Sequence, residues 1–216
     1  MDKFAIIESV AAALPEADID TDVIFPARFL LLLDKAGLGK HLFHERRYRD
    51  GKVTDFVLNR SPFDTAQIMV ANGNFGSGSS REQAVWALSD FGIRCVIAPS
   101  FGEIFYSNCF KNGVLPIVMT GADHAQAMSA AASGGPIRID LDKQEVMLPN
   151  GPALHFDIDP YRKRAMLLGL DEIGAILAED VPDIEAYEQQ QHARQPWVQL
   201  DAATLGRVFS KPSEPE

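Results

Sequence analysis

The chain has 216 residues, of which 46% are hydrophobic, so it is long enough to bury the core of one domain with added helices. Its formal net charge of −10 argues against nucleic acid and against an anionic membrane as partners. The apolar run from Phe29 to Leu33 is too short to span a membrane, and the first residues lack the basic segment and cleavage site of a secretory signal.

The N-terminal part predicts a strand followed by an acidic loop. Residues 4–10 have strand character, and the loop then carries aspartates at alternate positions: Asp18, Asp20 and Asp22. This spacing resembles the beginning of a calcium loop, but Val23 and Phe29 replace its glycine and its distal glutamate, so calcium is not expected. The acids either form a solvated turn beside a strand or border a pocket that has Arg28 nearby.

Residues 35–49 are predicted to form an exposed helix, before a short strand or turn over 56–59. His41 and His44 can share a face of this helix, but no third ligand is near in sequence, so a solvated basic face is a better interpretation than a metal site.

The two cysteines do not suggest a metal site either. Cys95 falls in a predicted strand and Cys109 in a predicted helix, and we expect both to be buried, reduced thiols of a cytoplasmic protein. Two cysteines are also too few to hold an iron–sulfur cluster.

The central motif is an apolar strand at 68–71, a loop rich in glycine, asparagine and serine, and a helix. Ser79 and Glu82 have the spacing of a capping box, which predicts that the helix starts at Ser79. Free N–H groups and the positive end of the helix dipole attract anions there. The positive charge of Arg81 is unfavourable at this positive end of the dipole. Its presence is explained either by a carboxylate or phosphate that the guanidinium grips, or by pairing with a surface acid.

Two nucleotide-binding motifs have partial matches in this loop, and both fail. Gly73 and Gly78 have the glycine spacing of a P-loop, but Ser79 stands where that motif needs lysine. The dinucleotide fingerprint fails because Arg81 stands where its third glycine should be. We therefore expect the anion to belong to a small acid rather than to a nucleotide.

The segments after the central helix continue to alternate between strands and helices. We expect strands over 94–98 and 114–119 and, between them, a helix over 101–110 that is terminated by Gly113. This alternation indicates right-handed crossovers and a parallel sheet. Ligands bind in loops at the C-terminal ends of such strands, and the loop at 72–81 is one of them.

The C-terminal part predicts an antiparallel appendage and further helices. The predicted elements are a helix over 123–132, strands over 137–141, 145–148 and 154–158, and helices over 161–168 and 171–178. The chain turns polar after Asp180. We expect residues 1–200 to form a single domain with C-terminal helices and residues 201–216 to form a polar, disordered tail.

Several sequence blocks occur in an order that resembles a known family. They are residues 20–30 (DTDVIFPARFL), 74–82 (NFGSGSSRE), 98–101 (APSF), 105–108 (FYSN), 112–117 (NGVLPI) and the spaced pattern between Met166 and Gly174. In these blocks the chain resembles the small subunit of 3-isopropylmalate dehydratase, also named isopropylmalate isomerase, which is similar to the swivelling domain of aconitase. The likeness covers nearly the whole chain except the tail.

The resemblance implies a fold, a partner and a reaction. The fold would be α/β, a swivelling β/β/α three-layer domain with a parallel core sheet and an antiparallel appendage. The partner would be a large subunit, in a heterodimer or a higher assembly, that carries a 4Fe–4S cluster held by three cysteines, and this chain would bind no metal. Together they would be a hydro-lyase of leucine biosynthesis that interconverts 2-isopropylmalate and 3-isopropylmalate through an enclosed alkene.

The resemblance also implies roles for individual residues. Ser79 would be the catalytic base, acting as an alkoxide, while Ser80 would hydrogen-bond the substrate and Arg81 would clamp its carboxylate. The segment that lies near the substrate's side chain would be Phe29, Leu30, Leu31 and Leu32. One hydroxyl cannot be both a committed helix cap and the base, so either Ser80 is the cap or Ser79 releases its bond when substrate arrives.

Departures from the family pattern leave the substrate open. Gln83 stands where many members have histidine, Ser77 replaces a frequent cysteine, and Lys35 begins a Lys-Ala-Gly run where Arg-Thr-Gly is common. The apolar segment 29–32 suits an isopropyl group but also methyl groups, so citraconate, dimethylmaleate or another branched diacid is an alternative substrate. Two further hypotheses for the chain are a non-catalytic scaffold subunit and a stand-alone anion-binding domain.

Overall fold

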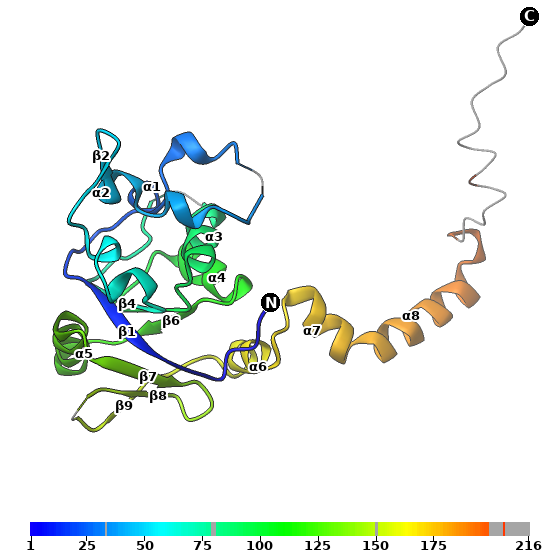
Figure 1. Ribbon diagram of the computed structural model, residues 1–216. Coiled ribbons are helices and arrows are strands. Elements are labelled where there is room, and N and C mark those ends of the chain that lie inside the picture. The colour runs from blue at the N-terminus through cyan, green and yellow to red at the C-terminus, as the bar shows by residue number, and fades with distance from the viewer. Residues whose placement is uncertain (33, 79–80, 150, 199–204, 206–216) are drawn as a thin grey trace, which may run out of the picture. The chain divides into compact units, whose positions relative to one another are not determined.

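Figure 1 shows the computed structural model of the chain, which describes residues 1–32, 34–78, 81–149, 151–198 and 205. The chain divides into two compact units, Met1–Glu172 and Ile173–Glu216, and each is described by itself. No helix within the described residues has the length and hydropathy that crossing a membrane requires.

The first unit is built on a seven-stranded mixed sheet. In sheet order the strands are β6 (Leu115–Val118), β5 (Cys95–Ala98), β4 (Ile68–Ala71), β1 (Ile6–Leu14), β7 (Pro136–Asp140), β8 (Glu145–Met147) and β9 (Ala153–His155). Strand β1 joins the two halves: residues 11–14 pair in parallel with β4, and residues 6–10 pair antiparallel with β7. The predicted parallel core with an antiparallel part is thereby confirmed.

Helices cover both faces of the sheet (Figure 1). The helices of this unit are α1 (Thr21–Ile24), α2 (His44–Arg47), α3 (Glu82–Phe91), α4 (Glu103–Lys111), α5 (Gly121–Ser133) and α6 (Pro160–Leu168). Alternate residues of β4 point to opposite faces: Met69 belongs to a hydrophobic cluster that includes α3, whereas Ile68 belongs to a second cluster that includes α5. Every residue of β4 and β5 is buried, as expected for parallel strands covered on both faces. The predicted α/β class is confirmed.

The predicted helix over residues 35–49 is wrong. This segment contains the 3-10 helix η2 (Gly39–His41), helix α2 and the hairpin formed by β2 (Tyr48–Arg49) and β3 (Lys52–Val53). Burial explains the difference, because Leu42 and Phe43 are both buried in the core and Phe43 adopts a left-handed φ of 47° before α2. The segment 57–65 likewise forms two short 3-10 helices, η3 (Val57–Asn59) and η4 (Phe63–Thr65).

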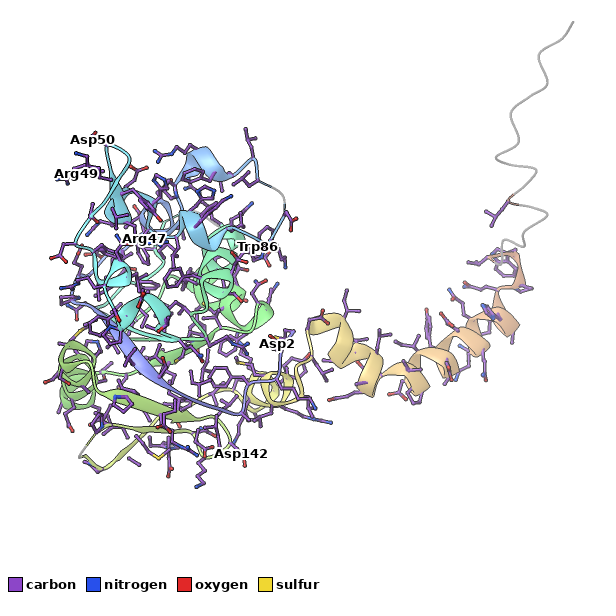
Figure 2. All side chains as sticks on the ribbon, in the orientation of Figure 1. Asp2, Arg47, Arg49, Asp50, Trp86 and Asp142 are labelled. Carbon is purple, nitrogen blue, oxygen red and sulfur yellow. The ribbon has the colours of Figure 1, made fainter. Side chains whose placement is uncertain are left out.

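The segment 37–47 packs closely against the end of α3. A Cβ atom on Gly39 would lie 2.6 Å from the backbone nitrogen of Phe91, so the approach requires glycine. Arg47, labelled in Figure 2, donates through Nη1 to the carbonyl of Gly39 at 3.1 Å and through Nε to Oδ1 of Asn59 at 3.0 Å. Its guanidinium also lies 4.9 Å from the ring centroid of Phe91. These contacts join the segment to the helix that follows the central loop.

The second unit contains helices only among its described residues. They are α7 (Glu172–Glu179), α8 (Val181–Arg194) and the 3-10 helix η5 (Pro196–Val198). The predicted helix over 171–178 is confirmed by α7, whereas α8 lies where the sequence predicts no more than a polar stretch. Of the tail expected over 201–216, only Leu205 lies within the described residues.

Candidate functional site

The loop at 72–78 lies at the C-terminal edge of the parallel strands, between two other loops. On one side, the backbone N–H of Gly76 donates to the carbonyl of Ile19 at 2.7 Å. On the other side, the N–H of Phe75 donates to the carbonyl of Ser100 at 3.1 Å. The loops after β1 and β5 thus hold this loop through main-chain hydrogen bonds, as neighbouring strands would.

Glycines allow other groups to approach the loop closely. Gly76 has a φ of 72°, and a Cβ atom there would lie 2.2 Å from Cγ of Phe105 in α4. A Cβ atom on Gly102 would lie 2.4 Å from the carbonyl oxygen of Gly76. No side chain fits in either place, so the ring of Phe105 and the backbone of the 100–102 loop both require glycine.

Asn74 is held in a left-handed conformation by polar bonds. Its φ is 59°, and that of Asp18 is 57°. The Asn74 side chain donates from Nδ2 to Oδ1 of Asp18 at 2.7 Å, and its backbone N–H donates to Oγ of Ser100 at 2.8 Å. Asparagine tolerates this conformation better than most residues, and the two bonds stabilise it further.

Each aspartate of the acidic loop has a partner. Asp18 accepts from Asn74, and Asp20 caps α1 by accepting from the backbone N–H of Val23 at 2.8 Å. Asp22 forms an ion pair with Nη1 of Arg81. Two of the three acids, Asp18 and Asp22, thus join the acidic loop to the central loop and to Arg81 while remaining exposed themselves.

Arg81 lies at the N-cap position of α3 with an extended backbone. The helix begins at Glu82, so the predicted start at Ser79 is wrong; Ser79 and Ser80 themselves lie outside the described residues. The Arg81 side chain is only 17% exposed and pairs with Asp22, in agreement with the surface-acid interpretation. Its location at the start of a helix also suits an anion.

The carboxylate of Glu82 accepts hydrogen bonds from two side chains of the described residues. Its Oε1 accepts from Nδ2 of Asn112 at 2.9 Å and from Nε1 of Trp86 at 3.2 Å. A capping box instead requires this carboxylate to turn back toward the start of the helix. The bond from Asn112 instead ties the first turn of α3 to the end of α4.

The predicted substrate-side-chain segment follows α1. Phe29 ends the 3-10 helix η1 (Ala27–Phe29), and its ring stacks on His41 with centroids 3.9 Å apart. Leu30 is partly buried, whereas Leu31 is 90% exposed and Leu32 is 40% exposed. Phe29 and Leu30 pack against the core, whereas Leu31 and Leu32 present their apolar side chains to solvent.

A cleft of about 660 Å³, lined by basic side chains and by the acids Glu45 and Asp50, borders this segment. Its lining includes Arg28, Lys40, His41, His44 and Arg49. Burial first, and then the charge of Lys40, lower the pKa of His41. Nη2 of Arg28 donates to Nδ1 of His44 at 2.8 Å, so this ring accepts a hydrogen bond from a cation. Burial and the neighbouring cations thus disfavour protonation of His41.

The cysteines do not form a metal site. Cys95 and Cys109 are fully buried, and burial raises the pKa of both thiols well above the usual range. Across the part of the chain that the structure describes, no group of three or more His, Cys, Asp or Glu side chains is arranged to hold a metal ion.

Comparison with known proteins defines the class first. A family model for the aconitase C-terminal domain matches residues 1–122, and the model LeuD_N matches residues 126–160. The helix-covered sheet and the hydrogen-bonded loop at 72–78 thus belong to a domain of the aconitase C-terminal type.

The 3-isopropylmalate dehydratase small subunit of Granulibacter bethesdensis is 50% identical over 200 residues, which cover 91% of this chain and 96% of that protein. The protein of the same name from Parvibaculum lavamentivorans is 49% identical over 202 residues, covering 92% of this chain and all of that protein. A crystal structure of 3-isopropylmalate dehydratase from Methanocaldococcus jannaschii superposes with a TM-score of 0.62 at 29% identity, covering 84% of this chain and 99% of that one. The chain belongs to the family of 3-isopropylmalate dehydratase small subunits, as the sequence resemblance predicted.

The sequence analysis did not assign a role to Ser100. Its hydroxyl and its carbonyl both accept bonds from the central loop. Its position in the sequence could have indicated a role in the site, because Ser100 follows the predicted strand that ends at Ala98, and the loops after such strands meet at one edge of the sheet.

Asn74 and Asn108 provide a matched test of the loop backbone. Asn74→Ala and Asn74→Gly both delete the bond to Asp18, but only alanine resists the left-handed φ. We expect alanine to lower the free energy of unfolding by about 1 kcal/mol more than glycine does. At Asn108, inside α4, the order should reverse because glycine is the poorer helix former. Urea unfolding measures both differences, and equal effects at Asn74 would contradict the proposed backbone constraint.

Proposed function

We propose that this chain is the small subunit of a cytoplasmic hydro-lyase that interconverts 2-isopropylmalate and 3-isopropylmalate in leucine biosynthesis. The observation that carries the proposal is Arg81, held at the start of α3 beside a loop that hydrogen bonds fix at the sheet edge. Membership of the dehydratase small-subunit family supports the substrate class.

The site needs a second chain. We expect a large subunit to bind this one as a heterodimer or a higher assembly, and to carry the 4Fe–4S cluster, because the two buried thiols of this chain do not fit the ligand set of a cluster. When bound, the cluster supplies a Lewis acid toward the substrate's hydroxyl group.

Arg81 binds a carboxylate of the diacid substrate. A guanidinium presents several N–H donors in a planar fork, and the ion pair with Asp22 uses a donor on Nη1. Substrate can therefore be held while Asp22 keeps the side chain oriented. The low exposure of Arg81, 17%, strengthens a charge-assisted hydrogen bond there relative to one in open water.

Ser79 moves the proton. As an alkoxide it removes a proton from the carbon beside a carboxylate, and as a hydroxyl it returns a proton during hydration. The start of α3 and the guanidinium of Arg81 stabilise the negative oxygen. Glu82 is engaged by Asn112 and Trp86, which supports a serine that is not committed to a reciprocal capping box. Ser80 contributes a hydrogen bond to the substrate.

The apolar contact for the substrate's branched group is formed by Phe29, Leu30, Leu31 and Leu32. The Leu31 side chain is 90% exposed in this chain, and binding of the large subunit and substrate would bury it. The same apolar character accommodates smaller methyl groups, so citraconate and dimethylmaleate are the specific rivals.

Ser79→Ala tests the catalytic role against a scaffold role. We expect kcat of the reconstituted complex to fall at least about 100-fold, because the general base is lost, while the complex still assembles. Steady-state kinetics and size-exclusion chromatography give the two readouts. Ser129→Ala in α5 is the matched control and should leave kcat unchanged. Retained activity in Ser79→Ala would favour a subunit that contributes no chemistry.

A panel of acids tests the substrate. The reconstituted pair is assayed on 2-isopropylmalate, citraconate and dimethylmaleate, and we expect the highest kcat/KM on 2-isopropylmalate because the exposed leucines add apolar contact with its extra carbons. Turnover of citraconate or dimethylmaleate without turnover of 2-isopropylmalate would contradict the proposed role in leucine biosynthesis. It would still agree with a hydro-lyase.

A further inference from the structure

A polar cluster connects the first turn of α3 with the end of α4. Glu82, the residue after Arg81, accepts hydrogen bonds from Asn112 at 2.9 Å and from the indole of Trp86 at 3.2 Å. Asn112 is the C-cap residue of α4, and its Nδ2 also donates to the carbonyl of Asn108 at 2.9 Å. Trp86, labelled in Figure 2, lies one helical turn beyond Glu82.

Lys35 joins the same cluster from a third segment. Its Nζ donates to Oδ1 of Asn112 at 3.2 Å and lies 4.6 Å from the ring centroid of Trp86. Lys35 belongs to the stretch that follows the predicted substrate segment 29–32. That stretch is also tied to the far end of α3, because Asp90 accepts from the backbone N–H groups of Gly37 at 3.1 Å and Gly39 at 2.6 Å.

The carboxylate of Glu82 is the centre of the cluster. The hydrogen bond from Asn112 lowers the pKa of Glu82, while burial opposes the shift, and the bond from Trp86 and the charges of Lys35 and Lys111 lower it further. The group is therefore ionised at neutral pH, and its bonds are charge-assisted.

The ion pair with Asp22 orients the guanidinium of Arg81, but the backbone of Arg81 stands just outside the regular helix. Arg81 makes no side-chain cap bond, and its backbone is extended, so the helix does not fix its direction through regular i to i−4 bonding. The next residue, Glu82, is anchored on both sides. The direction in which Arg81 leaves the helix thus depends on the residue that follows it as well as on Asp22.

We propose that Glu82 is a positioning residue that aims Arg81 at the substrate carboxylate, by tying the first turn of α3 to Asn112. Because Lys35 also bonds to Asn112, the residues that follow the predicted substrate segment 29–32 are connected to the first turn of α3. This inference rests on the carboxylate-binding role proposed above for Arg81.

Kinetics of the reconstituted complex on 2-isopropylmalate test the positioning. We expect Glu82→Ala to lower kcat/KM about 10- to 100-fold, mainly through a higher KM, because a small misplacement of a binding group is costly. Glu82→Gln keeps the Oε1 acceptor and should restore most of the activity. Asp123→Ala removes an acid from the first turn of α5 and is the matched control, with no change expected. Equal losses in Glu82→Ala and Glu82→Gln would overturn the proposal.

Asn112→Ala removes the same bond from the other side. It should reproduce the KM increase of Glu82→Ala, and full activity in Asn112→Ala would overturn the proposal. If Glu82→Ala fails to fold, Asn112→Ala still tests the positioning role.

A double-mutant cycle separates this inference from the proposed function. If Glu82 acts through Arg81, then Glu82→Ala should have little further effect on kcat/KM in an Arg81→Ala background. Independent, multiplicative losses would overturn the positioning role and leave Arg81 as a binding residue. An Arg81→Ala complex with unchanged KM would remove the role of Arg81 itself, and the positioning role with it.

Fluorescence gives a readout that needs no turnover. The chain has two tryptophans, so in a Trp197→Phe background the emission comes from Trp86. Glu82→Ala removes the acceptor of the Trp86 indole N–H and should shift the emission maximum, whereas Glu82→Gln should keep it near its original wavelength. An unchanged Trp86 spectrum in Glu82→Ala would overturn the bond on which the inference depends.

Discussion

The arrangement of the site depends on main-chain hydrogen bonds that hold the 72–78 loop between the loops after β1 and β5. These bonds satisfy backbone groups that no regular strand or helix pairs at this edge. They bring together residues that are far apart in sequence, such as Asp18, Asn74 and Ser100. Close packing requires glycine at 76 and 102, and at Gly76 the left-handed φ of 72° favours glycine as well.

Much of the fold could be predicted from the sequence because its strands are short apolar runs between clear helices. Ile68–Ala71 and Cys95–Ala98 are buried on both faces, which gives continuous hydrophobic sequence and identifies a parallel core. The prediction failed for residues 35–49, where the charged composition favours a helix but Leu42 and Phe43 enter the core and break it. Burial against α3 outweighed local propensity there.

Less of the site could be predicted. Arg81 is conspicuous in the sequence because a cation at a helix start opposes the dipole, and the pattern around Ser79 carries the family resemblance. The partner of Arg81 could be predicted only as an unspecified acid, since Asp22 is distant in sequence. The spacing of Glu82 predicts a local cap, whereas its actual partner, Asn112, lies at the end of another helix. Contacts between distant segments leave no periodic signal in the sequence.

This chain, in the proposed complex, supplies a carboxylate-binding guanidinium and a proton-transferring hydroxyl, and a second chain supplies the metal centre. The most direct measurement is hydration of the unsaturated diacid by the isolated, iron-free chain and by the same chain reconstituted with a cluster-bearing large subunit. We expect no turnover by the isolated chain and full turnover by the complex. Hydration at full rate by the isolated chain would contradict this division of roles.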